Sequence, residues 1–184
     1  TTLKLNSHDM TITANSGDSI ATTGGKLTVQ DAGNFAVTGA KAINANNSKV
    51  DITAVNATLN GDVSTNNVVN IKAMKAAKVN GAVAANGANS NVSISGEATT
   101  ITGAVAANGA NSNVSINGTA SAAISGAVSA VGANAAVTID SADTTIGSGI
   151  TANGKGAKVT AKNLSKLDGD VATDADGSVE LNFK

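Results

Sequence analysis

Few residues of this chain are of a type that performs chemistry, and the densest group of them is acidic. Oxygen ligands placed close together along a chain can bind Ca²⁺, and one short stretch carries four carboxylates: Asp168, Asp170, Asp174 and Asp176. Their spacing does not match an EF-hand loop, and the glycine-rich nonapeptide of calcium-binding β-rolls is absent. We therefore interpret the four aspartates as a solvated end of the fold and expect no metal site.

The single histidine, His8, is followed directly by Asp9. Adjacent residues on a strand face opposite sides, so the two could not form a joint site there, and we interpret them as a solvated turn. The chain has no cysteine and no arginine, which removes disulfides, thiolate ligands and bidentate phosphate clamps. We expect no catalytic residue, no cofactor and no enzymatic activity.

Six asparagines lie in N-x-S/T sequons, which license glycan attachment where a chain meets the right transferase. They are Asn46, Asn56, Asn91, Asn113, Asn117 and Asn163. Asn, Ser and Thr are abundant in this chain, so chance can also produce the pattern. We keep the six as candidate glycosylation sites and leave both interpretations open.

Composition narrows the range of partners. The chain carries 12 lysines against 13 acidic residues, a net charge of −1, which gives no positive footprint for nucleic acid. Phe35 and Phe183 are its only phenylalanines, and tyrosine and tryptophan are absent, so it offers no platform for stacking bases. No apolar run reaches the roughly 18 residues of a membrane span.

A repeated module organises the chain and must position everything else. The fourteen letters GAVAANGANSNVSI occur at 81–94 and again at 103–116, and a variant, GAVSAVGANAAVTI, follows at 126–139. A period of about 20 to 25 residues is typical of stacked units. Alternating triplets such as LKL at 3–5, LTV at 27–29 and VSI at 92–94 recur throughout and predict strands with one buried face.

Two further aliphatic columns follow each triplet. One contains Ile12, Val37, Leu59, Val79, Ile101, Ile124, Ile146 and Leu167; the other contains Ile20, Ile43, Val63, Val83, Val105, Val128, Ile150 and Val171. Three short strands per repeat predict one rung of a parallel β-helix, and the whole chain, 1–184, predicts one segment of about eight to nine rungs. The absence of proline agrees with this, because interior strands donate every N–H.

The corners and turns have their own signals. A glycine separates the second and third columns in most repeats, as in ITGAV at 101–105, and we expect it to adopt a positive φ. Phe35 is expected to fill a wider early corner, and Phe183 to pack on the last rung. Asn86 and Asn108 occupy equivalent positions, so their side chains are expected to stack as an amide ladder.

The blocks GGKLTVQ at 24–30 and GAVAANGANSNVSI at 81–94 resemble the haemagglutinin-type repeats of bacterial two-partner-secretion exoproteins, the filamentous haemagglutinin and HMW-like adhesins. The resemblance implies a right-handed β-helix that is secreted and lies on the bacterial cell surface, as an extended adhesive stalk. It also implies passage through an outer-membrane transporter. In HMW-like relatives the sequon asparagines carry sugars. The motifs of that family's amino-terminal secretion domain are missing, so we expect an internal or distal segment of a longer chain.

We therefore expect a structural and binding stalk of a bacterial adhesin that mediates attachment or aggregation. Its partners would be a host-cell receptor, a glycan or another copy of the adhesin. Two alternatives stay open: a self-assembling β-solenoid filament of the bactofilin kind, and an inactive carbohydrate-binding β-helix.

Overall fold

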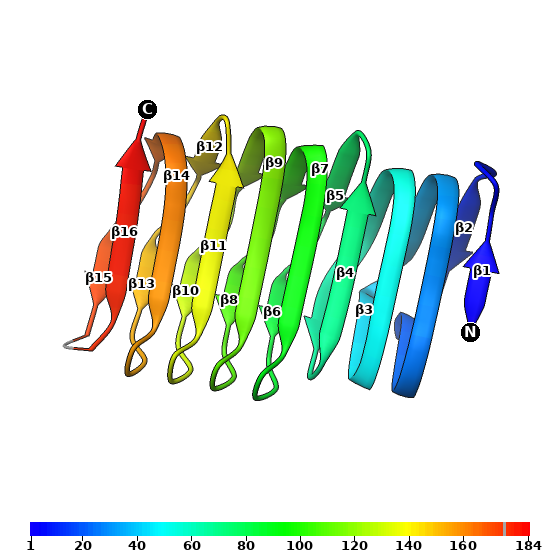
Figure 1. Cartoon of the computed structure of the whole chain (residues 1–184), viewed down its shortest axis with the longest axis horizontal. Helices are drawn as coiled ribbons and strands as arrows, with labels where there is room; N and C mark the ends of the chain where they lie inside the picture. Colours follow the sequence, from blue (N-terminus) through cyan, green and yellow to red (C-terminus); the bar gives the residue numbers. More distant parts are fainter. Residues whose placement is uncertain (175) are drawn as a thin grey trace.

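The chain winds into a parallel β-helix, as the repeat predicts. The computed structural model describes residues 1–174 and 176–184. Every regular element in that range is a β-strand, and the strands stack as about eight turns, or rungs, of one solenoid. Figure 1 shows the resulting rod, with the amino and carboxyl ends of the chain at opposite ends. No helix long and apolar enough to cross a membrane is present in the described range.

Each rung has a first, a second and a third strand position. Strands confined to the first position are β1 (Thr2–Lys4), β4 (Val68–Ala73), β11 (Ala136–Ser141) and β16 (Ser178–Phe183); those confined to the second are β2 (Met10–Thr13), β5 (Ala76–Val79) and β12 (Thr144–Ile146). The third position holds β6 (Val83–Ala85), β8 (Val105–Ala107), β10 (Val128–Ala130), β13 (Ile150–Ala152) and β15 (Val171–Thr173). Four strands run on around corners: β3 (Asp18–Thr65), β7 (Asn91–Ile101), β9 (Asn113–Ile124) and β14 (Lys158–Leu167).

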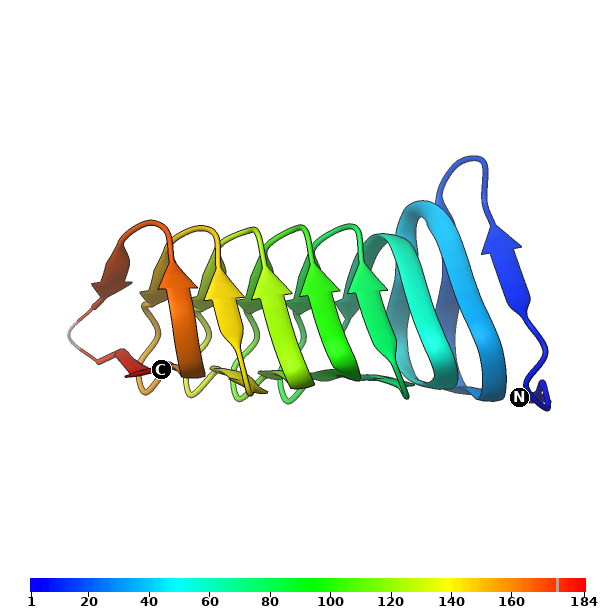
Figure 2. The same cartoon turned by 90° about the horizontal axis from the view of Figure 1, so that it is seen from above.

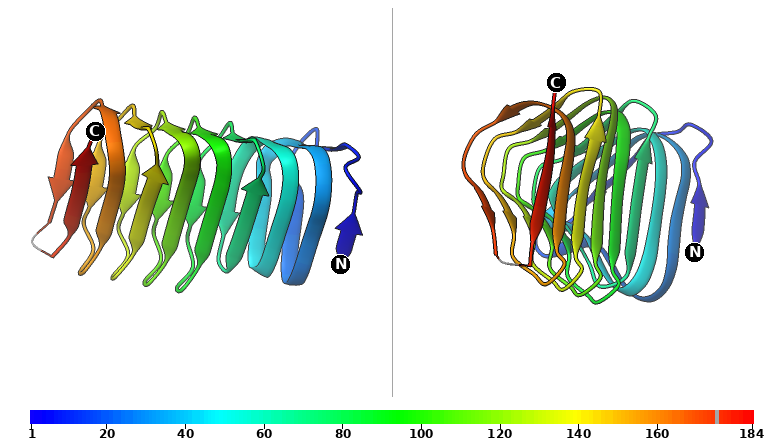
Figure 3. Two further views of the ribbon diagram at one scale, coloured as in Figure 1. Left: turned by 45° about the horizontal axis from the view of Figure 1, so that its top comes forward. Right: turned by 60° about the vertical axis from the view of Figure 1, so that its left-hand side comes forward.

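The predicted aliphatic columns are in register. Along the second strand position, Val79 pairs with Ile101, Ile101 with Ile124, and Ile124 with Ile146, always in parallel. Along the third, Val83 pairs with Val105 and Val105 with Val128. These side chains are all buried and join one hydrophobic core that follows the rod axis. Figure 2 and the oblique view in Figure 3 show the rungs as successive loops along the rod.

The corner glycines are required for a different reason than the sequence suggests. Gly61 and Gly169 do adopt a positive φ, of 144° and 102°, but Gly81, Gly103 and Gly126 do not. A Cβ on Gly103 would lie 2.5 Å from the carbonyl carbon and oxygen of Gly81 in the preceding rung. The prediction of positive φ is therefore wrong for these three corners, where glycine is needed because adjacent backbones approach too closely for a side chain.

The first rung stacks differently from the prediction. The triplets at 3–5 and 27–29 suggest that Leu3 lies over Leu27, whereas Leu3 pairs with Val29. Asn6 and Ser7 adopt left-handed φ values of 47° and 65°, so the chain turns there directly after β1. Because strand side chains alternate with a period of two, this shift by two residues keeps the same residues facing inward.

The two phenylalanines have opposite environments. Phe35 is fully buried and pairs with Met10 on β2, so its ring fills the core at the second strand position of an early rung. The prediction that Phe183 packs on the last rung is wrong, since its side chain is 62% exposed. Its strand β16 pairs only with β14 in the described chain, so one edge of that rung is uncovered.

Candidate functional site

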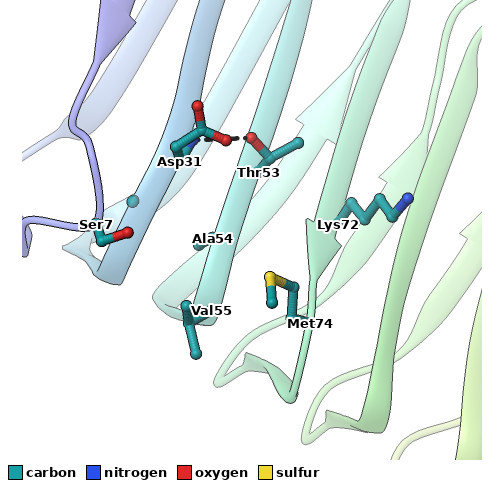
Figure 4. A pocket seen from close by; sticks show the side chains of 8 residues that line it. Ser7, Asp31, Thr53, Ala54, Val55, Lys72 and Met74 are labelled. Carbon is teal, nitrogen blue, oxygen red and sulfur yellow. Dashed lines mark hydrogen bonds between the residues drawn. The ribbon is translucent and has the colours of Figure 1, made fainter.

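A groove crosses four successive rungs at the corner between the first and second strand positions (Figure 4). Its volume is about 330 Å³, and it is lined by Ser7, Asp31, Ala32, Thr53, Ala54, Val55, Lys72 and Met74. These residues come from the loop after β1, from β3, and from β4 with the residue that follows it. The volume is at the small end of the range for ligand pockets.

The chemistry of this groove is that of a binding surface. Met74 is 72% exposed, and Figure 4 shows its side chain turned toward β3, while Lys72 extends away over the next rung. The Thr53 hydroxyl donates to the carbonyl oxygen of Val29 at 3.4 Å and accepts from the Asp31 backbone N–H at 3.1 Å. The Thr53 hydroxyl is engaged in both bonds, and the side chains of Ala54, Val55 and Met74 give the groove an apolar lining that can hold a small apolar group.

A second, polar groove lies further along the same corner. It has a volume of about 410 Å³ and is lined by Asn117, Gly118, Thr119, Asp140, Ser141, Ala142 and Asn163. The Asn117 amide donates to the Ser115 hydroxyl, and the Asn163 amide donates to the Ser141 carbonyl. The Asp140 carboxylate is held by the Lys162 ammonium at 2.6 Å. The amide oxygens are left as acceptors, which suits a ligand that donates hydrogen bonds.

The structure separates the six sequon asparagines by the state of their amide nitrogens. The side-chain nitrogens of Asn56, Asn113, Asn117 and Asn163 donate to neighbouring groups in the rod. Asn91 accepts a bond from Asn113 and is half-buried in β7. Asn46 alone among the six is exposed, and its oxygen accepts from the Asn66 amide while its nitrogen makes no bond to another described residue. Asn46 is therefore the most accessible of the six candidate sites.

Asparagine ladders cover much of the outer surface, and they have a common direction. The Asn108 amide nitrogen donates to the Asn86 oxygen at 2.9 Å, which confirms the predicted ladder at that position. Every other Asn–Asn bond in the described chain runs the same way, from a later rung to an earlier one. Since each amide then presents an oxygen to the next rung, the ladder is stabilised by bonds that extend the backbone pairing outward.

Aspartates accept the final bond of several ladders. Asn56 donates to Asn34, and Asn34 donates to the Asp9 carboxylate through its backbone and its side-chain N–H groups. These two donors lower the pKa of Asp9, with the backbone bond the larger cause. At Asp51 partial burial raises the pKa, but the bond from Asn70 and the charges of Lys26 and Lys49 outweigh it and lower the pKa overall.

The histidine and the aspartates that the sequence offered as candidate site residues do not form a common site in the fold. His8 is exposed in the loop between β1 and β2, and Asp9 is occupied by Asn34. Asp168 pairs with Lys166 at 2.7 Å, and Asp174 accepts from the backbone N–H groups of its own turn. Within the described range, no three His, Cys, Asp or Glu side chains gather as a metal-binding group would require.

One patch of charged side chains on the surface is not among the features predicted from the sequence. The stretch KAMKAAK at 72–78 places Lys72, Lys75 and Lys78 outward on a single rung, with the exposed Met74 among them. We call these three lysines the lysine ridge. The recurrence of lysine among alanines at 72–78 indicates an exposed basic patch. The groove beside the ridge depends on how four corners stack, so the sequence of one rung does not predict it.

Similarity to known proteins does not assign the chain to a family. Comparison with protein-family models, with curated proteins and with solved structures finds no match for it.

Proposed function

We propose that this chain is a rigid stalk of a secreted bacterial surface adhesin. The observation that carries the proposal is the unbroken aliphatic core, which runs in register from Ile12 on β2 to Leu167 on β14. Parallel backbone pairing along the strands holds each rung to the next, so the rod resists bending. Such a rod can hold binding groups at a distance from a cell surface. The resemblance of the repeats to haemagglutinin-type exoproteins supports the same proposal.

The outer surface supports binding through many weak contacts. Along the first strand position the outward residues include Ser93, Ser115, Thr138 and Thr160, which stack in register. Between Lys78 and Asp140 the only charged residue is Glu97. Neutral hydroxyl and amide groups can exchange bonds with water for bonds to a sugar or a protein at a small net gain each. Function would then depend on many copies acting together.

Multivalent display tests this mechanism. Rods attached by one end to beads should bind host cells or a glycan array with an avidity about 10²-fold to 10⁴-fold above that of the free rod. A charge-matched unrelated β-solenoid on the same beads is the control. Equal binding by the control beads would show that the surface of this chain has no adhesive role.

Two further observations separate the adhesin from its rival. Protease treatment of intact native cells should remove the protein if it lies on the surface, and a neighbouring gene for an outer-membrane transporter would support secretion. Protection from protease, together with filaments of purified protein in electron micrographs, would favour the self-assembling filament instead.

A further inference from the structure

The positive charge of the lysine ridge is only partly offset by its neighbours on the same rod. Lys72 stacks between Thr53 and Ser95, and Lys78 stacks between Thr58 and Thr100, so their neighbours in register are uncharged. None of the ion pairs found within the described range involves a ridge lysine. Among the described residues, Glu97 lies directly against the ridge, where its backbone N–H donates to the Lys75 carbonyl. Asp31 lines the same groove as Lys72 but lies two rungs away.

The last rung has the opposite character. Asp170, Asp174 and Asp176 are exposed there, and no ion pair within the described range includes them. We call these three residues the acidic end. Lys155 lies on the adjacent turn, where the following Gly156 N–H donates to the Asp176 carbonyl. With that lysine and with Glu97 included, the acidic end has a net charge of −2 and the lysine ridge +2.

The two patches are separated along the rod and around it. From Lys78 the column passes through Thr100, Ala123 and Thr145 to Lys166, which is four rung steps, or about 19 Å. The ridge occupies the first and second strand positions and their corner, whereas Asp170 and Asp174 flank β15 at the third. One copy can therefore use both patches at once.

We propose that the lysine ridge of one copy binds the acidic end of a second copy, so that rods associate side by side with a stagger of about four rungs. Between the patches, residues 79–139 carry Glu97 as their only charge, and further along Lys162 pairs with Asp140 and Lys166 with Asp168, so this stretch allows close approach with little repulsion. Because the two patches differ, the contact is heterologous and extends to an open array. This inference depends on surface charge alone and does not require the proposed adhesin function.

The test is sedimentation velocity of the full chain at two ionic strengths. The Debye length is about 30 Å at about 0.01 M salt and about 3 Å at 1 M salt. Because salt screens the attraction between the two patches, association should appear at the lower salt concentration and vanish at the higher. The ridge variant Lys72→Glu/Lys75→Glu and the acidic-end variant Asp170→Lys/Asp176→Lys should each weaken association about tenfold or more. The control Lys4→Glu/Lys41→Glu has the same change in net charge as the ridge variant and should associate normally.

Mixing the two reversed variants makes the test specific. Each alone presents like charges on both patches, but an equimolar mixture restores an acidic end opposite an unaltered ridge and should associate again. Circular dichroism spectra equal to that of the parent would show that the variants fold. A parent chain that stays monomeric at low salt, a ridge variant that associates normally, or a mixture that fails to associate would each overturn the proposal. Binding of polyglutamate by a monomeric parent would assign the ridge to another acidic partner.

Discussion

Replacing Gly103 by alanine tests the claim that rung contact, and not backbone conformation, requires glycine at the corners. The new Cβ would lie 2.5 Å from the carbonyl carbon of Gly81, and an unstrained carbon contact needs about 3.5 Å. The rungs must therefore separate by about 1 Å at this corner. The bond from the Gly103 N–H to the Gly81 carbonyl, now 3.0 Å, would then stretch to about 4 Å and be lost.

The expected cost follows from these displacements. Overpacking costs about 1 to 3 kcal/mol, and each lost backbone bond adds about 0.5 to 1.5 kcal/mol. We expect Gly103→Ala to lower the free energy of unfolding by about 3 kcal/mol. The matched control is Gly147→Ala at the same kind of corner, where the nearest atom is the Ser125 carbonyl oxygen at 3.1 Å and φ is not in the left-handed region. Its cost should stay below about 1 kcal/mol, because a small shift relieves the contact and alanine restricts the unfolded chain.

Urea unfolding followed by far-ultraviolet circular dichroism gives the comparison, since the chain has no tryptophan or tyrosine to act as a fluorescent probe. Solenoid stability is nearly a sum of rung and neighbour contributions, so hydrogen exchange should localise the damage. Amides of Val83 and Val105 should exchange faster in the Gly103→Ala variant, and those of Ile12 should not. If Gly103→Ala is as stable as Gly147→Ala, close backbone approach does not explain why glycine recurs at these corners.

Three other predictions follow from the outer surface and the turns. The Ser112 hydroxyl is buried and makes no hydrogen bond within the described range, whereas the Ser90 hydroxyl donates to the Gly87 carbonyl. Because Ser112→Ala removes a buried polar group that has no partner, it should raise the free energy of unfolding by about 1 kcal/mol in urea unfolding. Ser90→Ala should not raise it. The bonds that Asp9 accepts from Asn34 on β3 lower its pKa, so they stabilise the fold above the ordinary aspartate pKa of about 4 and are lost as pH falls through the folded value. The stability gap between the parent and Asp9→Asn should therefore close in acid. If a native host glycosylates the chain, Asn46→Gln should remove the main sugar mass in intact-mass spectra, and Asn113→Gln should leave it unchanged.

The core could be predicted because its signal is repeated in every rung. Ile101, Ile124 and Ile146 recur at nearly constant spacing, and only a stacked arrangement buries all three in one column. The reason for the glycine at 103 could not be predicted in the same way, because it depends on the distance to Gly81 in the neighbouring rung. The groove at Met74 and the isolation of the lysine ridge also depend on neighbours in register, which one copy of the repeat does not contain.

The distribution of charged side chains also favours one stacking register between neighbouring rungs. The modules at 81–94 and 103–116 are identical, so a slip by one whole module would bury the same side chains and cost little in the core. Outside these modules the ladders end on particular aspartates: Asn34 on Asp9, Asn44 on Asp18 and Asn70 on Asp51. A slip would leave such a carboxylate without its amide donor and would break ion pairs such as Lys162 with Asp140. The uniform modules can therefore repeat freely because the charged rungs on either side fix where the stacking begins and ends.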